Sequence, residues 1–226
     1  MYNGKDKNIQ TYLKSRKLVQ EQLKIEEVPF QNNRLIIDEL SSFDMSSCSL
    51  QGPHNRFNCF CAITVAKRLG VDDEIIQMGL NTFINAPHRM EQVATIDEVQ
   101  FINDSKATNV DAVYYALLSM EQPVVWVVGG IDKGNDYNII LPLVKEKVKA
   151  IICLGADNTR IKEAFEYLGR PIEETQQTKK AIQLARKYAT SGDVVLLSPA
   201  CSSFDLFKNY EARGDQFREA VLELRD

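Results

Sequence analysis

The stretch Pro123–Gly130, PVVWVVGG, decides the fold of this chain. The five residues after the proline are apolar, and four of them are β-branched valines. Such an uninterrupted run is typical of a strand that is buried on both faces, as in a parallel sheet covered by helices. The two glycines that follow could mark the end of the strand, where the backbone needs a positive φ. We therefore predict a central strand here.

Strand and helix patterns alternate on both sides of this run. Before it, residues 89–96 and 99–104 are predicted strands joined by a turn at residues 97–98, and residues 110–120 are a predicted helix. The predicted elements after it are helices over residues 137–148, 158–169, 178–189 and 212–225, strands over residues 149–155 and 192–200, and an edge strand near residues 172–176. This alternation predicts an α/β fold with a mostly parallel sheet flanked by helices.

The first 86 residues follow a different pattern. Residues 5–24 carry apolar side chains at helical spacing among lysines and arginines, which predicts an amphipathic helix. The elements predicted next are short strands over residues 26–30 and 33–38, an irregular serine-rich stretch over residues 41–55, and helices over residues 55–70 and 72–83. Pro87 disfavours helical backbone at the residue before it. We therefore place a domain boundary there, between residues 1–86 and residues 87–226.

Composition narrows the function classes. Of the 226 residues, 44% are apolar and 26% are charged, which is ordinary for a soluble globular protein. The net charge of -4 gives no sign of a nucleic-acid partner, which usually requires a basic patch. No apolar stretch approaches the ~20 residues that span a bilayer, and the N-terminus has no apolar signal region. We expect a cytoplasmic protein without nucleic-acid or membrane partners.

Cysteine and histidine contents exclude further classes. The five cysteines lack the spacing of a disulfide framework or a zinc site, so we expect core thiols in a reducing compartment. The only histidines are His54 and His88, which excludes a histidine-rich metal site.

Small and polar residues follow four of the predicted strands. They form the loops NDSKATN (103–109), GGIDKGND (129–136), GADN (155–158) and SPACSSFD (198–205). Ligands of open parallel sheets bind beyond the carboxyl ends of the strands, so these loops should line one rim. Lys106 and Lys133 make that rim locally cationic in an acidic protein. The sequence therefore predicts an anionic partner with carboxylate or phosphate groups.

Each loop also has a purely structural interpretation. Asp104 could form a turn, and Thr108 or Asn109 could cap the following helix. The glycine pair does not match the pattern GxGxxG, so no dinucleotide site is predicted. Two lysines and several hydroxyl groups on one side of a sheet favour a ligand site over the structural interpretation.

Two further pairs of residues stand out. His88 and Arg89 lie at the predicted domain boundary, where clefts favour ligands, and the planar fork of arginine suits phosphate oxygens. Asn55 and Asn58 lie three residues apart at the start of a predicted helix. They share one face and could be caps or amides that read the edge of a base.

Five motifs resemble those of the Mur ligases in order and in spacing. They are GPHNRFN (52–58), PHRME (87–91), NDSKATN (103–109), GGIDKG (129–134) and SPACSSFDLFKNYEARGDQF (198–217). The resemblance runs from about residue 50 to the end and is strongest to the members that add D-glutamate. It implies ATP- and Mg²⁺-dependent amide formation in peptidoglycan precursor synthesis. The carboxylate of UDP-MurNAc-L-alanine is phosphorylated to an acyl phosphate, which the amine of D-glutamate then attacks.

The resemblance also implies a division into domains. Mur ligases have an N-terminal domain for the UDP-sugar, a central ATPase domain and a C-terminal Rossmann-like domain. Residues 1–86 resemble the end of the central domain, and residues 87–226 resemble the whole C-terminal domain that binds D-glutamate.

Roles in ATP binding and catalysis follow from the matched positions. Asn55 and Asn58 match residues that contact adenine, and Arg89 matches an arginine at the ATP phosphates. Asp104 matches an aspartate near the ribose, and Lys106 matches a lysine beside the reacting centre. The histidine before the arginine is given no chemical role.

A second set of positions matches residues that hold D-glutamate. The matched residues are Thr108, Lys133, Ser203 and Phe204. Tyr210 takes the place of an aromatic residue in that set. A small diacid needs such cationic and hydroxyl donors for its two carboxylates.

The chain departs from the family pattern in one important respect. It has no GxxxxGK[ST] loop, and the family's carbamylated lysine, its Mg²⁺-binding glutamate and its UDP-binding domain have no counterpart. We therefore expect the main Mg²⁺ ligands to lie in an absent part and this chain alone to be inactive. Met1 would then be an expression start or a later start codon. The polar groups of residues 103–109 should point at solvent, because the half-site that they face is missing.

Other interpretations of the sequence stay open. The chain could derive from another Mur ligase or from a relative of folylpolyglutamate synthase. It could also be a non-catalytic module that binds an amino acid or a nucleotide. In each case we expect a monomer.

Overall fold

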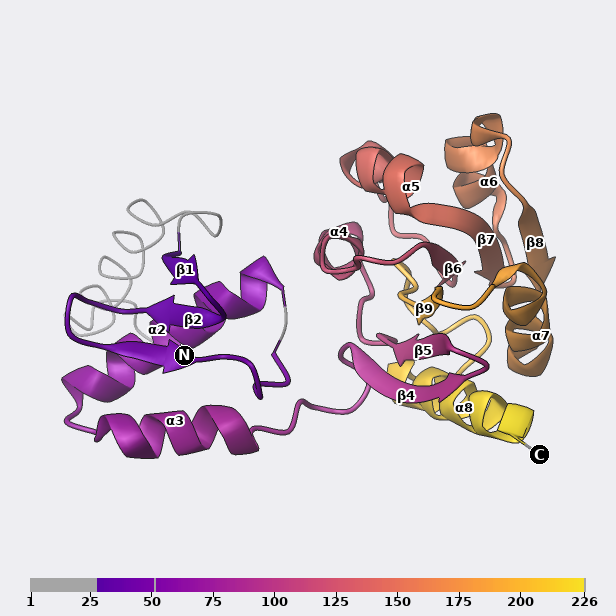
Figure 1. Ribbon diagram of the computed structural model, residues 1–226. Coiled ribbons are helices and arrows are strands. Elements are labelled where there is room, and N and C mark those ends of the chain that lie inside the picture. Colours follow the sequence, from indigo (N-terminus) through magenta and orange to yellow (C-terminus); the bar gives the residue numbers. More distant parts are fainter. Residues whose placement is uncertain (1–27, 51, 226) are drawn as a thin grey trace, which may run out of the picture. The chain divides into compact units, whose positions relative to one another are not determined.

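The computed structural model describes residues 28–50 and 52–225, so the helix predicted over residues 5–24 lies outside the described residues. Contacts divide the chain into two compact units, Met1–Ile84 and Asn85–Asp226. We call them the first and the second unit and describe each by itself (Figure 1). The identities predicted for the two parts of the chain remain proposals.

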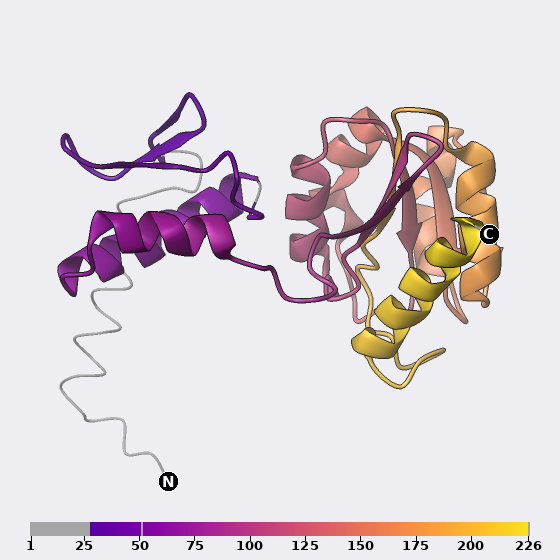
Figure 2. The same cartoon turned by 60° about the horizontal axis from the view of Figure 1, so that its bottom comes forward.

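The first unit contains a small antiparallel sheet and two helices. Its elements are β1 (Phe30–Gln31), β2 (Arg34–Ile36), β3 (Ser42–Asp44), α2 (Pro53–Arg68) and α3 (Asp73–Thr82). Figure 2 shows the strands on one side of the helix pair. The prediction of an irregular stretch over residues 41–55 is wrong for β3. Phe43 pairs with Leu35, and both are buried, but three residues are too few to show a strand period in the sequence.

The second unit is built on a six-stranded sheet with the order β4-β5-β9-β6-β7-β8. Its strands are β4 (Glu91–Ile96), β5 (Val99–Asn103), β6 (Val124–Val128), β7 (Val148–Leu154), β8 (Ile172–Thr175) and β9 (Val194–Leu197). All neighbouring pairs are parallel except β4 and β5, which form a hairpin. Asp97 and Glu98 turn this hairpin with φ values of 49° and 61°. The predicted α/β class with a mostly parallel sheet is confirmed.

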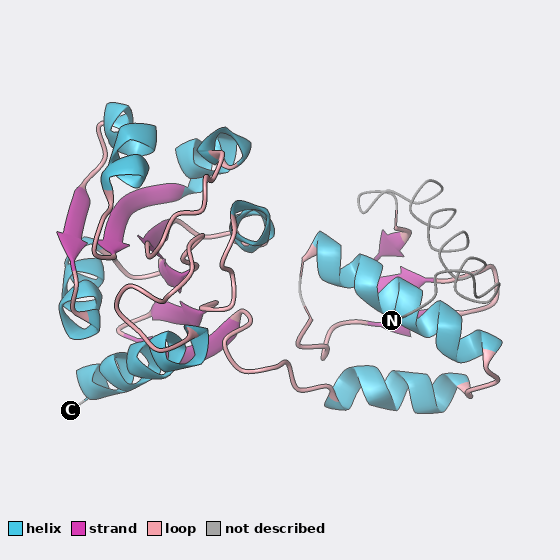
Figure 3. Ribbon diagram, turned by 180° about the vertical axis from the view of Figure 1, so that it is seen from behind, coloured by secondary structure: helices cyan, strands magenta, loops and turns pink. Residues whose placement is uncertain are grey.

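The predicted central strand explains why helices cover both faces. All five residues of β6 are fully buried, and they alternate between two separate apolar clusters. One cluster holds α4 (Val110–Leu118), α5 (Leu141–Lys147) and α6 (Thr159–Phe165), and the other holds α7 (Thr178–Tyr188) and α8 (Tyr210–Leu222). Figure 3 shows these two helical layers on opposite sides of the sheet.

Strand order places the candidate rim. Strand β9 enters the sheet between β5 and β6, although it is the last strand in the sequence. The helix after β9 packs on one face, whereas the helices after β5 and β6 pack on the other. The loop after β9 therefore lies at a topological switch point, between the loops after β5 and β6, which is where open α/β sheets bind ligands.

Two helix predictions differ from the structure. The helix predicted over residues 137–148 is split into the 3₁₀ turn η2 (Tyr137–Ile139) and α5, with Pro142 in the first turn of α5, where a missing N–H group is tolerated. Helix α8 begins at Tyr210, two residues before the predicted start, because the Asn209 side chain accepts a hydrogen bond from the Ala212 amide and caps it. Tyr210 therefore lies on a helix and not in the preceding loop.

The glycines after β6 give the first testable prediction. Gly130 has a φ of 124°, and a Cβ there would lie 2.2 Å from the Ser202 carbonyl oxygen, whereas a Cβ at Gly134, with a φ of 92°, would meet nothing within 4 Å. We expect Gly130→Ala to reduce the free energy of unfolding by about 3 kcal/mol or more, and Gly134→Ala by about 1 kcal/mol. Urea unfolding followed by the fluorescence of Trp126, the single tryptophan, measures both. Equal costs would show that close packing is not what requires Gly130.

Candidate functional site

One buried arginine ties three of the four rim loops together. The side chain of Arg213, in α8, is 1% exposed. It donates to Ser105 O at 2.9 Å and Ser105 Oγ at 3.0 Å after β5, to Gly129 O at 3.3 Å after β6, and to Cys201 O at 3.1 Å after β9. Burial lowers the pKa of Arg213 to about 10, so the guanidinium stays charged at neutral pH. The rim is therefore organised around a fixed cation.

The corner 103–109 is anchored at both ends by asparagine side chains. Asn103 is fully buried, accepts from the Ser105 amide at 3.2 Å and donates to Gly214 O at 3.1 Å. Asn109 accepts from the Ala112 amide at 2.8 Å and caps α4. Of the two predicted caps, Asn109 is thus the one that the helix uses, and Thr108 stays half-buried at the rim.

The expectation that the polar groups of this corner point at solvent is wrong for Asp104. Asp104 is only 7% exposed, and its carboxylate accepts hydrogen bonds from Ser198 Oγ at 2.9 Å and from the Met90 amide at 3.2 Å. Ser198 follows β9 directly, so the neighbouring loop covers the carboxylate. Burial raises the pKa of Asp104 to about 7, although both hydrogen bonds and the charge of Arg89 oppose the shift.

Lys106 also has a defined place. Its Nζ donates to the Tyr210 hydroxyl at 2.8 Å and lies 4.2 Å from the centroid of the tyrosine ring. The Lys106 amide donates to His88 O at 3.1 Å, which joins the corner to the start of the second unit. The structure therefore brings together two residues, Lys106 and Tyr210, that were predicted from different motifs.

His88 belongs to a buried network and not to an open surface. It is 6% exposed, and its Nδ1 lies 3.0 Å from Asn103 Nδ2. Glu91 beside it forms two hydrogen bonds with Arg218, at 2.9 and 3.0 Å. A Cβ at Gly214 would lie 2.2 Å from His88 Nδ1, so α8 needs a glycine there for close packing. The network fixes the backbone before Arg89, whose own side chain is exposed.

The remaining predicted site residues lie on two loops of the rim and in the first unit. Lys133 is exposed on the loop after β6, and on the loop after β9 Ser203 is 2% exposed and Phe204 is 67% exposed. Asn55 and Asn58 lie in the first two turns of α2 in the first unit, half-buried and exposed, respectively.

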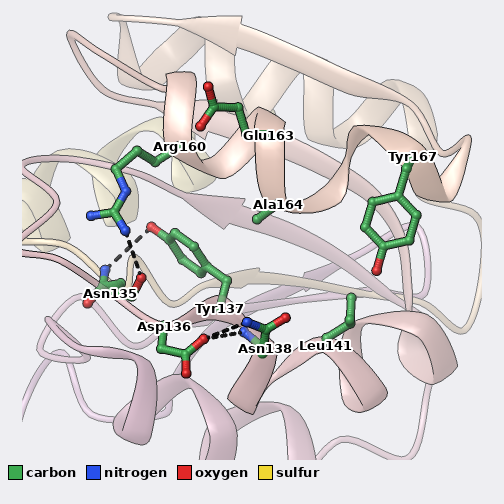
Figure 4. Close-up of a pocket in the computed structure, with 9 residues that line it drawn as sticks. All are labelled: Asn135, Asp136, Tyr137, Asn138, Leu141, Arg160, Glu163, Ala164 and Tyr167. Carbon is green, nitrogen blue, oxygen red and sulfur yellow. Dashed lines mark hydrogen bonds between the residues drawn. The ribbon is translucent and has the colours of Figure 1, made fainter.

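Two pockets lie beside the segment that follows β6. One, of about 390 Å³, lies between η2 and α6 and is lined by residues that include Tyr137, Leu141 and Tyr167 (Figure 4). The other, of about 320 Å³, is lined by Gly130, Asp132, Arg160 and Asp205 among others. Arg160 borders both and is already paired, at 2.8 Å, with Asp132. An anion would find no unpaired cation among the residues that line these two pockets.

No group of three or more histidine, cysteine, aspartate or glutamate side chains in residues 28–50 and 52–225 could hold a metal ion. Within the same described ranges, no helix is long and apolar enough to cross a bilayer.

Several residues that build the site were missed in the sequence. Arg213, Asn103 and Ser198 act through buried contacts with residues about a hundred positions away, and no local pattern announces such contacts. The only local signal is that Arg213 and Gly214 fall on the inward face of a predicted helix, where an arginine is unusual.

The second unit is thus a Rossmann-like domain that has two lysines and several hydroxyls at its switch point. Residues 88–201, just over half of the chain, match the family described as Mur ligase, glutamate ligase domain. The chain belongs to the Mur ligase family, and the predicted resemblance is confirmed.

Two curated relatives are named as ligases that add D-glutamate. The chain is similar to the UDP-N-acetylmuramoylalanine--D-glutamate ligase of Christiangramia forsetii, with 45% identity over 234 residues that cover 99% of this chain and 53% of that protein. A protein of the same name from Cytophaga hutchinsonii is 53% identical over 175 residues, which cover 77% of this chain and 39% of that protein. The chain thus spans about half of the length of the first of these relatives and less than half of the second.

Solved structures support the fold. A pseudomurein peptide ligase type C from Methanothermus fervidus superposes with a TM-score of 0.60 at 20% identity, covering 86% of this chain and 40% of that one. MurF from Acinetobacter baumannii superposes with a TM-score of 0.58 at 21% identity, covering 79% and 40%.

The loop-tying role of Arg213 can be tested by truncation. Arg213→Ala leaves three buried carbonyl groups without their donor, so we expect a loss of about 3 kcal/mol or more in the free energy of unfolding. Arg218→Ala, on the same helix, removes a partly exposed ion pair and should cost about 1 kcal/mol. Urea unfolding followed by Trp126 fluorescence compares them. Similar costs for the two variants would argue against a special role for Arg213.

The raised pKa of Asp104 predicts a pH dependence of stability. Because the native pKa lies above the ordinary value of about 4, the native state holds the proton more tightly than the unfolded chain does. The contribution of Asp104 to the free energy of unfolding is fully present below about pH 4 and is lost as the pH rises through about 7. Asp104→Asn should lose less stability over that interval than the wild-type chain does, in urea unfolding at several pH values. Asp111→Asn, an exposed control on α4, should follow the wild-type chain, and an identical course for Asp104→Asn would contradict the assignment.

Proposed function

We propose that this chain is the D-glutamate-binding part of an ATP-dependent ligase that adds D-glutamate to UDP-MurNAc-L-alanine during cytoplasmic synthesis of peptidoglycan precursors. Residues 1–86 would be the end of the central ATP-binding domain, and residues 87–226 the C-terminal domain. One observation carries the proposal: the family match over residues 88–201 contains three of the rim loops and both rim lysines. Identities of 45% and 53% to proteins named as D-glutamate ligases support the choice of amino acid.

The reaction of this family would bring the anionic oxygens of a carboxylate and an acyl phosphate to the rim. ATP phosphorylates the substrate carboxylate, and the amine of D-glutamate attacks the acyl phosphate and displaces phosphate. Cations that are already in position stabilise the charge that develops on these oxygens. In this chain Lys106, which donates a hydrogen bond to the Tyr210 hydroxyl, would supply that charge at the reacting carboxylate.

D-glutamate would bind between the loops after β5, β6 and β9. Lys133 and Thr108 offer a cation and a hydroxyl to one carboxylate, and Ser203 with its neighbour Phe204 and the ring of Tyr210 would surround the rest of the molecule. The exposed Lys133 has donors available for this task. Arg89, Asp104, Asn55 and Asn58 would serve ATP, the first at its phosphates.

Metal chemistry is not assigned to this chain. The family's Mg²⁺-binding glutamate has no counterpart in the sequence, so the main Mg²⁺ ligands are proposed to lie in another part of the enzyme. The phosphate cradle of the family is likewise absent from the sequence, and the chain alone is expected to be inactive.

Other ligases of the same fold are weaker candidates. The folylpolyglutamate synthase of Yersinia pestis superposes with a TM-score of 0.57, but its identity of 20% supports the fold alone. A non-catalytic binding module has no observation in its favour beyond the absent phosphate cradle.

Titration calorimetry with D- and L-glutamate tests the proposal on this chain. We expect weak binding with a preference for the D form, and Lys133→Met should weaken it about tenfold, because a charge-assisted hydrogen bond to a carboxylate is lost. Lys179→Met, which changes an exposed lysine on α7, is the matched control and should bind like the wild-type chain. Equal affinity for both enantiomers would count against a D-glutamate site.

A further inference from the structure

The ammonium group of Lys106 is held by one residue in two ways. Tyr210 accepts a hydrogen bond from Lys106 Nζ at 2.8 Å and presents its ring with the centroid 4.2 Å from the same atom. The backbone of Tyr210 is tied to the same corner, because Ser105 Oγ donates to Tyr210 O at 2.7 Å. The tyrosine is therefore fixed relative to the corner on which the lysine stands.

We propose that Tyr210 is a positioning residue, which holds the Lys106 ammonium at one place on the rim before an anionic substrate arrives. Lysine has a flexible four-carbon chain, and an ordered lysine loses less freedom when it meets a ligand. The hydroxyl occupies one of the three ammonium donors, so two stay available for substrate oxygens. The inference rests on the proposed function for the role of Lys106 at the reacting carboxylate.

The first arm of the test measures the order of Lys106 in this chain. Nuclear magnetic resonance of ¹⁵N-labelled lysine side chains should show an ordered Lys106 ammonium beside a mobile Lys208, which is exposed. Tyr210→Phe keeps the ring and removes the hydroxyl, and it should make Lys106 more mobile, although still less mobile than Lys208, because the contact with the ring remains. Glu219→Ala, on the same helix, should change nothing. An unchanged Lys106 in Tyr210→Phe would overturn the proposal.

The second arm measures binding of acetyl phosphate, a small acyl phosphate, by titration of the same side-chain signals. We expect Tyr210→Phe to weaken binding about three- to fivefold, as the loss of one hydrogen bond would, and Lys106→Met to weaken it further. If Lys106→Met binds like the wild-type chain, or if the wild-type chain does not bind, the proposed role of Lys106 fails and the first arm alone decides whether it is held. If only Lys106→Met weakens binding, Lys106 keeps its role and the positioning proposal is wrong.

Discussion

The buried guanidinium of Arg213 is the interaction on which the rest of the site depends. Loops at the carboxyl edge of a parallel sheet are the part of such a fold with the fewest apolar contacts. Here three of them share one donor group, whose hydrogen bonds end on carbonyl oxygens of three loops and on a serine hydroxyl. A buried charge is costly unless its hydrogen bonds are made, so the loops and the arginine require each other.

Helix α8 extends this constraint from the loops to the candidate catalytic lysine. Tyr210, Arg213 and Gly214 are three and four residues apart and therefore lie on one face of the helix. Tyr210 contacts Lys106, Arg213 joins the loops, and Gly214 leaves room for His88. A single helix surface thus sets the positions of groups that come from β4, β5, β6 and β9.

The sequence predicted the sheet better than the site, and the reason is physical. The apolar run at residues 124–128 and the alternation around it are local patterns, and they predicted the central strand, the edge strand β8 and the fold class. The site depends on buried polar contacts such as Ser105 to Arg213, 108 residues apart, or Ser198 to Asp104, 94 residues apart. Local patterns carry no information on such pairs. Asp104 was therefore expected in solvent, and Arg213, although it lies in one of the matched motifs, was given no role.

The cations of the second unit differ in what they can still bind. Arg213 donates to main-chain carbonyls and to the Ser105 hydroxyl, so it could bind a ligand only if the contacts between the loops were broken. Arg160 donates to Asp132 and to Asn135 O, so it could bind a ligand only if its ion pair were broken. Lys106 has given one donor to a neutral hydroxyl, and Lys133 is exposed. Anionic ligands can therefore compete for the two lysines at small cost. This difference in availability, more than the number of positive charges, is what favours the rim between β5, β9 and β6 as the candidate anion-binding region of an acidic protein.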